Sequence, residues 1–475
     1  MQLERRPAYE RSPNRLSASH GGVAHQSLGP TQLLLRSLPC SHLRDFASRR
    51  KPIAALARVV VGGLVAATLG AGAEAHADDH IESTTTWFQE KRAGGLGGLT
   101  VIHPQLDIGI DAGETMTLGL GYDADVVSGA TSKVYTVDAV SSATTFNDVR
   151  HDGNLSIGFN GRRSHLTFHG AAATESDYNS IAVGASGDID LPGKNTNVAL
   201  SYNHNFDQTC DRDNANATIF ERRTLDSSTN CMKKNGIFGK DMVGTTLWRD
   251  LTIDTTQATI TQDLSPTMIG QVSLFGQIMS GFLSNPYRAV RVRNVEAQET
   301  VPDARARLAV TARLNRYIPT LHSAVHFLLR GYSDTWGVRS GTFELSYSQY
   351  AGKSLLIRFR GRVYQQTAAT FYKDAFYYQT EGEAGTYFTG DRELGRLRNV
   401  VAGAKLSYIK VGEQGANVWG VFDQVRLNLK ADLLFMSELA ADDPAANPEG
   451  IDREFLSSGQ FLDGFVLQLG LLLSY

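Results

Sequence analysis

The chain has 475 residues, of which 42% are hydrophobic and 20% are charged, with a formal net charge of −3. Without an excess or clusters of basic residues, we expect no nucleic-acid partner. A helical membrane protein would carry several apolar runs of about 20 residues, and only one candidate run occurs near the N-terminus.

That apolar run has the surroundings of a secretory signal. Residues 49–51 are Arg-Arg-Lys, residues 53–70 are largely apolar, and residues 75–77 read Ala-His-Ala. A basic start, an apolar centre and an A-x-A end predict a signal peptide over residues 48–77. The alternative is a single membrane anchor, which the interruption at Arg58 disfavours.

With the signal peptide placed at residues 48–77, the residues before it and the cysteines after it can be interpreted. Residues 1–47 show no periodicity, and we interpret them as a leader that is either disordered or the product of a misassigned start codon. The mature chain, residues 78–475, has a net charge of −9 and retains Cys210 and Cys231. In an exported protein this pair predicts a disulfide within a long polar loop, with two free thiols as the alternative.

From Ile81 onward, apolar and polar residues alternate in segments of about ten residues that turn signals separate. Such period-2 alternation predicts β-strands with one apolar face. We count about 16 strands, beginning with residues 81–92. Representative stripes run over residues 155–159, 198–202, 308–314, 343–347, 357–363 and 425–433.

The predicted connections alternate in length. Short turns are expected near Pro192, Ser265-Pro266, Pro319 and Ala351-Gly352, and long polar loops over 206–251, 283–303, 368–395 and 437–459. Short turns at one end and long loops at the other are typical of outer-membrane barrels, whose short turns are periplasmic. The sequence therefore predicts an all-β fold, a single antiparallel transmembrane β-barrel over residues 78–475 in the cell outer membrane.

The C-terminal segment strengthens this prediction. Alternate residues from Phe465 to the terminal Tyr475 are apolar and share one face. A last strand that ends on an aromatic residue is similar to the signal for barrel insertion. We accordingly expect outer-membrane lipid and the barrel assembly machinery as partners.

Several short strings resemble a known family. In chain order they are Ser284-Asn285-Pro286-Tyr287-Arg288, Pro302-Asp303-Ala304-Arg305, Asp334-Thr335-Trp336-Gly337, Arg362-Val363-Tyr364-Gln365-Gln366, Phe371-Tyr372 and Gly390-Asp391-Arg392. They resemble a bacterial outer-membrane family, domain of unknown function 3570, over about residues 81–475. The resemblance implies a barrel without an assigned activity. It also implies gene neighbours that include a flavin transferase and a thioredoxin-like protein, hence possible partners in redox work outside the cytoplasm.

One motif is similar to a flavin attachment site. Asp125-Val126-Val127-Ser128-Gly129-Ala130-Thr131 has the pattern D-x-x-S-G-A-T, at which flavin transferases link FMN to a threonine hydroxyl. Thr131 would be the nucleophile, Gly129 and Ala130 would admit the backbone into the transferase cleft, and Asp125 and Ser128 complete the pattern. The alternative is an ordinary strand end rich in small polar residues.

Topology weighs against the flavin hypothesis. The strand count places residues 126–151 at the outer side of the membrane, whereas a flavin transferase works in the periplasm. Attachment would therefore require modification before barrel assembly or a loop folded into the lumen. A motif of seven residues is a hypothesis until its structural context supports it.

Arginines form the second candidate site, on the polar face of the predicted strands. Charge that faces lipid near the midplane costs about 2–4 kcal/mol, so we expect these side chains in the lumen. There they would favour anions, or would instead form salt bridges that stiffen the barrel. They are Arg305, Arg307, Arg313, Arg330, Arg358, Arg360 and Arg362.

No other pattern points to chemistry. The sequence lacks G-x-S-x-G, H-E-x-x-H, C-x-x-C and phosphate-loop motifs, so we predict neither a catalytic residue nor a metal site. The sequence thus favours a pore over an extracytoplasmic redox component, which would carry FMN or support an electron-transfer partner. An outer-membrane enzyme ranks last.

Overall fold

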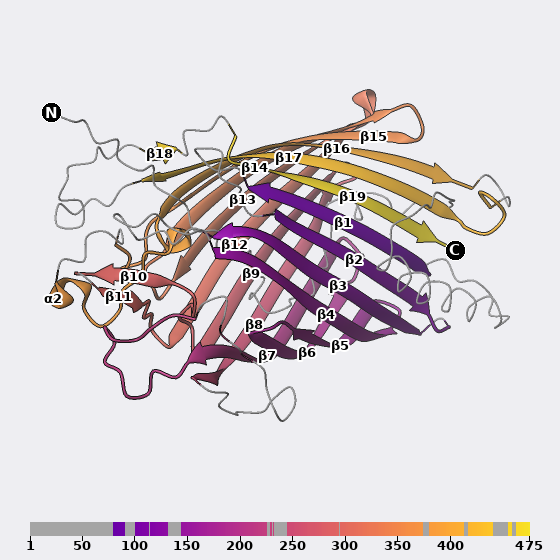
Figure 1. Cartoon of the computed structure of the whole chain (residues 1–475). Coiled ribbons are helices and arrows are strands. Elements are labelled where there is room, and N and C mark those ends of the chain that lie inside the picture. The colour runs from indigo at the N-terminus through magenta and orange to yellow at the C-terminus, as the bar shows by residue number, and fades with distance from the viewer. Residues whose placement is uncertain are drawn as a thin grey trace.

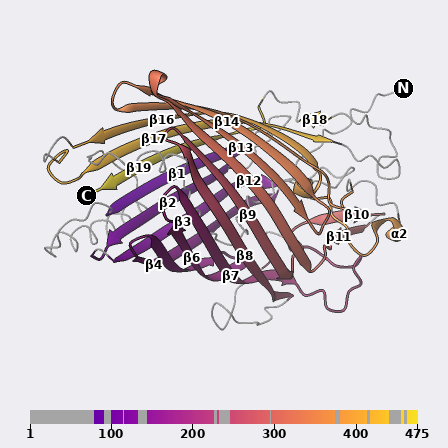
Figure 2. The same cartoon turned by 180° about the vertical axis from the view of Figure 1, so that it is seen from behind.

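The computed structural model describes residues 79–90, 100–113, 115–131, 144–225, 229, 231, 245–293, 295–373, 380–412, 417–439, 455–457 and 462–475. The predicted leader and signal peptide lie outside the described residues. Figures 1 and 2 show a wide barrel from opposite sides.

Sixteen strands form a closed antiparallel barrel in which each strand pairs with its neighbours along the chain. The first and last strands close it, from His80 opposite Ser474 to Glu90 opposite Gly464. The barrel strands are β1 (His80–Glu90), β2 (Thr100–Asp111), β3 (Met116–Thr131), β4 (Thr144–Asn160), β5 (Ser164–Thr174), β6 (Tyr178–Asp190), β7 (Thr196–Arg212), β8 (Thr246–Ser265), β9 (Met268–Gly281), β12 (Ala304–Ile318), β13 (Ser323–Asp334), β14 (Arg339–Ala351), β15 (Leu355–Gln366), β16 (Arg396–Val411), β17 (Gln424–Leu439) and β19 (Gly464–Ser474). The predicted fold class is confirmed.

The other elements belong to the connections. A small hairpin, β10 (Ala289–Val292) and β11 (Val295–Gln298), follows β9, and β18 (Phe455–Ser457) adds to the end of β17. One helical turn, α2 (Glu381–Ala384), and two 3-10 turns, η3 (Pro319–Leu321) and η4 (Arg392–Leu394), complete the described structure. Within these described parts, none of the helices combines the length and the apolar character that crossing a membrane requires.

We call the end of the barrel at which β1 begins and β19 ends the turn end, and the opposite end the loop end. At the turn end, the predicted short turns near Pro192, Ser265-Pro266, Pro319 and Ala351-Gly352 join consecutive strands. The hairpin β10–β11 and α2 lie beyond the strand ends at the loop end (Figure 1). This arrangement places the turn end in the periplasm and the loop end outside the cell.

Side chains alternate between two environments along each strand. One set is apolar and exposed, as for Leu308, Phe359 and Leu469, which are 51%, 58% and 53% exposed. The alternate set contains polar residues that are buried, such as Asn205 and Asp432. The crowded polar set lies on the inner face of the closed barrel, and the apolar set faces lipid.

The predicted limits of one long loop were wrong. The loop expected over residues 206–251 begins only after Arg212 and ends before Thr246, because β7 and β8 continue as a paired ladder to these residues. Polar side chains near the ends of this ladder, such as Asp207 and Asp211, are almost completely buried. Their polarity resembles that of a loop, whereas the structure buries them on strands.

Candidate functional site: the inner wall of the barrel

The site starts from a run of alternate arginines on β15. Arg358, Arg360 and Arg362 are two residues apart, so a strand places all three on one face. Phe359 and Val363, which belong to the alternate positions of the same strand, are 58% and 46% exposed and face lipid. The arginines therefore lie on the inner face, and cross-strand pairing sets them beside Ser348, Ser346 and Glu344 of β14.

Two of these arginines have polar partners on neighbouring strands. Nε of Arg358 donates to Oγ of Ser348 at 2.8 Å. Arg360 forms ion pairs with Asp432 at 2.6 Å and with Glu344 at 3.7 Å. A carboxylate on each side thus compensates the charge of Arg360.

Three other predicted arginines have no direct polar partner among the described residues, although Glu344 lies opposite Arg362 across the strand pair. Arg313 on β12, Arg330 on β13 and Arg362 on β15 share the inner face of their strands. Among the residues that the structure describes, none forms an ion pair or a side-chain hydrogen bond with these three. Their guanidinium groups remain available to a solute.

The remaining two predicted arginines lie near the loop end and are held in place. Arg305 pairs with the buried carboxylate of Asp334, to which its Nε donates at 2.9 Å, and it stacks over the ring of Trp336 at 4.2 Å. Arg307 donates from Nη1 to Oε1 of Gln277 at 3.1 Å. These contacts give Arg305 and Arg307 a structural role at the loop end of the inner face.

Sequence reasoning missed further cations on the same wall. Lys405 on β16 lies opposite Lys430 on β17, and both alternate with lipid-facing residues, as does Arg426. Nζ of Lys430 is 3.1 Å from Asp432. The polar side of the alternation contains all three residues and could have identified them. We call the inner face of β12–β17 the basic wall.

The inner face of β2–β4 has the opposite charge. His103 on β2 is 2.6 Å from the carboxylate of Asp125 on β3, and Asp123 lies two residues away on the same face. Across the next strand pair, Asp123 faces Asp152 of β4, which accepts from Arg150 at 3.4 Å. We call this inner face, on which Asp123, Asp125, Asp152, His103 and Arg150 cluster, the acidic wall.

The structure separates the residues of the flavin-type motif. Asp125 belongs to the acidic wall, whereas the backbone of residues 128–131 forms the loop end of β3, with Ser128 opposite Asn147 and Thr131 opposite Thr144. Ser128 also pairs with Thr100 of β2, so β2 and β4 flank the strand there. Gly129 and Ala130 likewise pair with β4. The motif is regular strand at the loop end.

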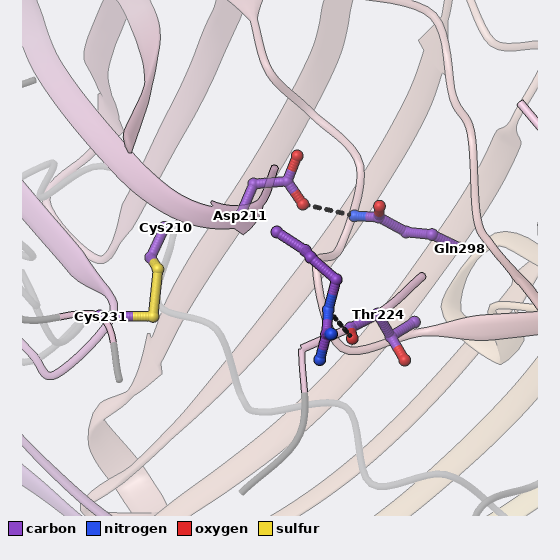
Figure 3. Close-up of a disulfide and its surroundings, with 6 residues drawn as sticks. Cys210, Asp211, Thr224, Cys231 and Gln298 are labelled. Atoms are coloured by element: carbon purple, nitrogen blue, oxygen red, sulfur yellow. Dashed lines mark hydrogen bonds between the residues drawn. A yellow bond between two sulfur atoms is a disulfide. The ribbon is translucent and has the colours of Figure 1, made fainter. Parts of the chain in front are cut away.

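At the loop end, the described parts of the connections after β7, between β9 and β12 and between β15 and β16 form a structure that we call the cap. Cys210, near the end of β7, forms a disulfide with Cys231 in the following loop (Figure 3). Beside it, Oδ1 of Asp211 accepts a hydrogen bond from Nε2 of Gln298 at 2.9 Å, which joins β7 to the loop between β9 and β12. The disulfide and this hydrogen bond thereby anchor two loops to one strand end.

A buried ion-pair network holds the cap to a third loop. Arg288 pairs with Glu299 at 3.6 Å and with Asp391, which lies between β15 and β16. Glu299 also accepts from the hydroxyl of Thr389 at 2.6 Å and from the backbone N–H of Asn285 at 2.7 Å. Burial raises the pKa of Glu299 above its ordinary value, although Arg288 opposes the shift.

Neither wall has the geometry of a metal site. Within the described ranges, no group of three or more histidine, cysteine, aspartate or glutamate side chains could hold a metal ion. The two walls can instead act on a solute through charge and hydrogen bonding.

Comparison with solved structures returns barrels of outer-membrane proteins at very low identity. A bacterial polysaccharide outer-membrane secretin shares 10% identity, with 85% of this chain and all of that chain covered and a TM-score of 0.41. CdiB from Acinetobacter baumannii shares 9% identity, with 85% and 61% covered and a TM-score of 0.42. An anion-selective porin from Comamonas acidovorans shares 10%, with 84% and 98% covered and a TM-score of 0.34.

No curated protein matches the chain significantly in sequence. One family model does match, over residues 53–418, which is well over half of the chain. The match includes the acidic wall and the strands of the basic wall from β12 to β16, and it ends before β17. The chain therefore belongs to the family described as protein of unknown function, DUF3570.

Proposed function

We propose that the protein is an outer-membrane pore that favours small anionic solutes and has no enzymatic activity. The observation that carries the proposal is a set of inner-face guanidinium groups, at Arg313, Arg330 and Arg362, that form no direct ion pair with any described residue. Charged rings in a low-dielectric channel select ions of opposite sign. Guanidinium groups also bind carboxylate or phosphate groups through paired hydrogen bonds.

The distribution of the other charges supports this proposal. The basic wall extends over six strands, and its Lys405 and Lys430 add to the arginines. Asp432 offsets Arg360 and Lys430, and Glu344 lies near Arg360 and opposite Arg362. The acidic wall begins at β2, which β1 and β19 separate from β17 in the closed sheet. Walls of opposite sign produce a field across the lumen, which draws the anionic group of a solute toward β12–β17.

The test is the ion selectivity of the purified barrel in a planar lipid bilayer under a KCl gradient. We expect conductance steps with a reversal potential that shows preference for chloride. In the triple variant Arg313→Gln, Arg330→Gln, Arg362→Gln this preference should disappear, because three cationic groups leave the inner wall. No conductance, or an unchanged reversal potential in the triple variant, would refute the proposal.

A matched control removes the same charge elsewhere. Arg163, Lys194 and Lys353 are exposed in turns at the turn end. The triple variant Arg163→Gln, Lys194→Gln, Lys353→Gln should retain most of the chloride preference, since these groups lie outside the inner wall. A loss as large as that in the first triple variant would assign the selectivity to net charge and would count against the basic wall.

A further inference from the structure

The lipid-facing surface has a notch where two adjacent strands both lack side chains. Gly331 of β13 lies directly opposite Gly341 of β14, and both belong to the face that carries the exposed apolar residues. A Cβ atom added to either glycine would meet nothing within 4 Å. The notch is therefore open space on the surface, and packing does not require glycine at either position.

The walls of the notch are mostly apolar and its volume is about 430 Å³. Besides the two glycines, it is lined by Leu329, Phe343 and Val363 and by the polar residues Arg330, Thr342 and Gln365. Leu329 and Phe343 are 58% and 44% exposed, so these large side chains stand beside the notch and leave it unfilled. A slender apolar group, such as an acyl chain of the surrounding lipid, fits the shape and the polarity of this space.

The notch is at the loop end, and arginines lie next to it on the same outer face. Arg339 is the first residue of β14, two residues before Gly341 and nearer the loop end, and it is exposed. Gln365 lies opposite Arg398 of β16, which donates to Oε1 of Gln365 from Nη2 at 3.1 Å and from Nε at 3.3 Å. An apolar slot thus adjoins two guanidinium groups on the side nearer the extracellular water.

We propose that the notch binds one acyl chain of a phosphorylated glycolipid of the lipid A type, and that Arg339 and Arg398 bind its phosphate. Lipid A supplies both parts, because it carries several acyl chains next to phosphate groups and forms the outer leaflet. Arginine side chains extend toward the interface and form charge-assisted hydrogen bonds to phosphate. The site rests on the outer-membrane location in the proposed function, and it is independent of the pore.

Native mass spectrometry of the delipidated full-length barrel, after incubation with lipid A or with phosphatidylglycerol, tests the proposal. We expect one lipid A molecule to remain bound at collision energies that release phosphatidylglycerol. Gly341→Leu fills the notch and should weaken lipid A binding about tenfold or more. Gly331→Leu should do the same. Arg339→Gln combined with Arg398→Gln should weaken it comparably.

Two controls separate this site from general effects on the barrel. Gly276 of β9 lies between the lipid-facing Leu274 and Ile278, and a Cβ there would also meet nothing within 4 Å. Gly276→Leu should leave lipid A binding unchanged, as should Lys410→Gln near the turn end. Heat-modifiable migration in electrophoresis identifies folded barrels. Lipid A binding is compared only among variants that show this migration.

Equal affinity for both lipids, or equal loss in Gly341→Leu and Gly276→Leu, would overturn the site. The bilayer conductance of Gly341→Leu distinguishes this proposal from the pore. Unchanged conductance with lost lipid binding supports the lipid site, and retained lipid binding in Gly341→Leu refutes it whatever the conductance.

Discussion

Arg360 and Asp432 form an ion pair across an intervening strand, with 2.6 Å between Nη2 and Oδ2. Arg360 is on β15 and Asp432 on β17, and β16 passes between them with Gly403 opposite both residues. A Cβ at Gly403 would stand 2.0 Å from Oδ1 of Asp432. The glycine therefore provides the space in which a carboxylate from one strand neutralises an arginine two strands away.

We predict that Asp432→Asn increases the preference of the pore for anions. Asp432 also lies 3.1 Å from Nζ of Lys430, so the substitution leaves two cations of the basic wall with less compensation. The permeability ratio of chloride to potassium should rise by roughly twofold. The reversal potential in a planar bilayer measures this ratio.

The control for Asp432→Asn is Glu221→Gln, which removes one negative charge from an exposed position in the cap. Glu221→Gln should leave the ratio close to that of the wild type, because exposed charges beyond a Debye length are screened. A fall in the ratio for Asp432→Asn would show that the carboxylate does not offset the basic wall.

We predict that Arg288→Met loosens the cap strongly. Arg288 and Glu299 are almost completely buried, and Arg288 also pairs with Asp391. Removing the cation leaves two carboxylates close together without their ion-pair partner, which for a buried pair costs about 3–5 kcal/mol. Hydrogen–deuterium exchange should show faster exchange in residues 282–303 and 380–395, with the barrel strands unaffected.

A double variant distinguishes charge from packing in that result. Glu299→Gln added to Arg288→Met removes one of the two carboxylate charges and keeps the side-chain size, so protection of residues 282–303 should partly return. Exchange that is equally fast in the single and double variants would instead assign the loss to the missing packing of Arg288.

The pH dependence of the cap follows from Glu299. Burial raises the pKa of Glu299 in the folded cap above the ordinary value of 4.5. At a pH between 4.5 and the raised pKa, the folded state therefore binds more protons than the unfolded state. Stability of the cap therefore falls as pH rises through this window, and the full loss is present above the raised pKa. We predict lower protection of residues 295–301 at pH 8 than at pH 5, after correction for intrinsic exchange. The Glu299→Gln variant should lack this dependence, and higher protection of the wild type at pH 8 would contradict the assignment.

The strand pattern could be predicted from sequence because the inner and outer faces of this barrel differ in polarity. Exposed stripes such as Leu308 to Leu314 stand in lipid, where each polar substitution costs energy, so the alternation stays regular. The same reasoning placed the last strand, Gly464–Ser474, and the short turn at Pro192. It failed for the top of β7, where both the loop and the strand are polar.

The contacts of the inner wall could not be predicted, because alternation gives a face and no partner. Arg305 and Arg313 look alike in sequence, yet one pairs with Asp334 and the other has no ion-pair partner among the described residues. Which arginine has an ion-pair partner depends on the register between neighbouring strands, and the sequence alone does not give that register. The cap was equally hidden, since Arg288, Glu299 and Asp391 meet only through three-dimensional packing of two loops.

We predict that Thr131 carries no flavin in the mature protein. Its segment of β3 forms a regular ladder with β4 at the loop end, from Ser128 opposite Asn147 to Thr131 opposite Thr144, whereas a flavin transferase acts in the periplasm. A backbone held in a sheet also cannot enter a transferase cleft. The intact mass of protein purified from the outer membrane should equal that of the unmodified mature chain. An added mass of one phosphoester-linked FMN, absent from Thr131→Ala and present in Thr117→Ala at the turn end of β3, would establish modification before barrel assembly and favour the redox function over the pore.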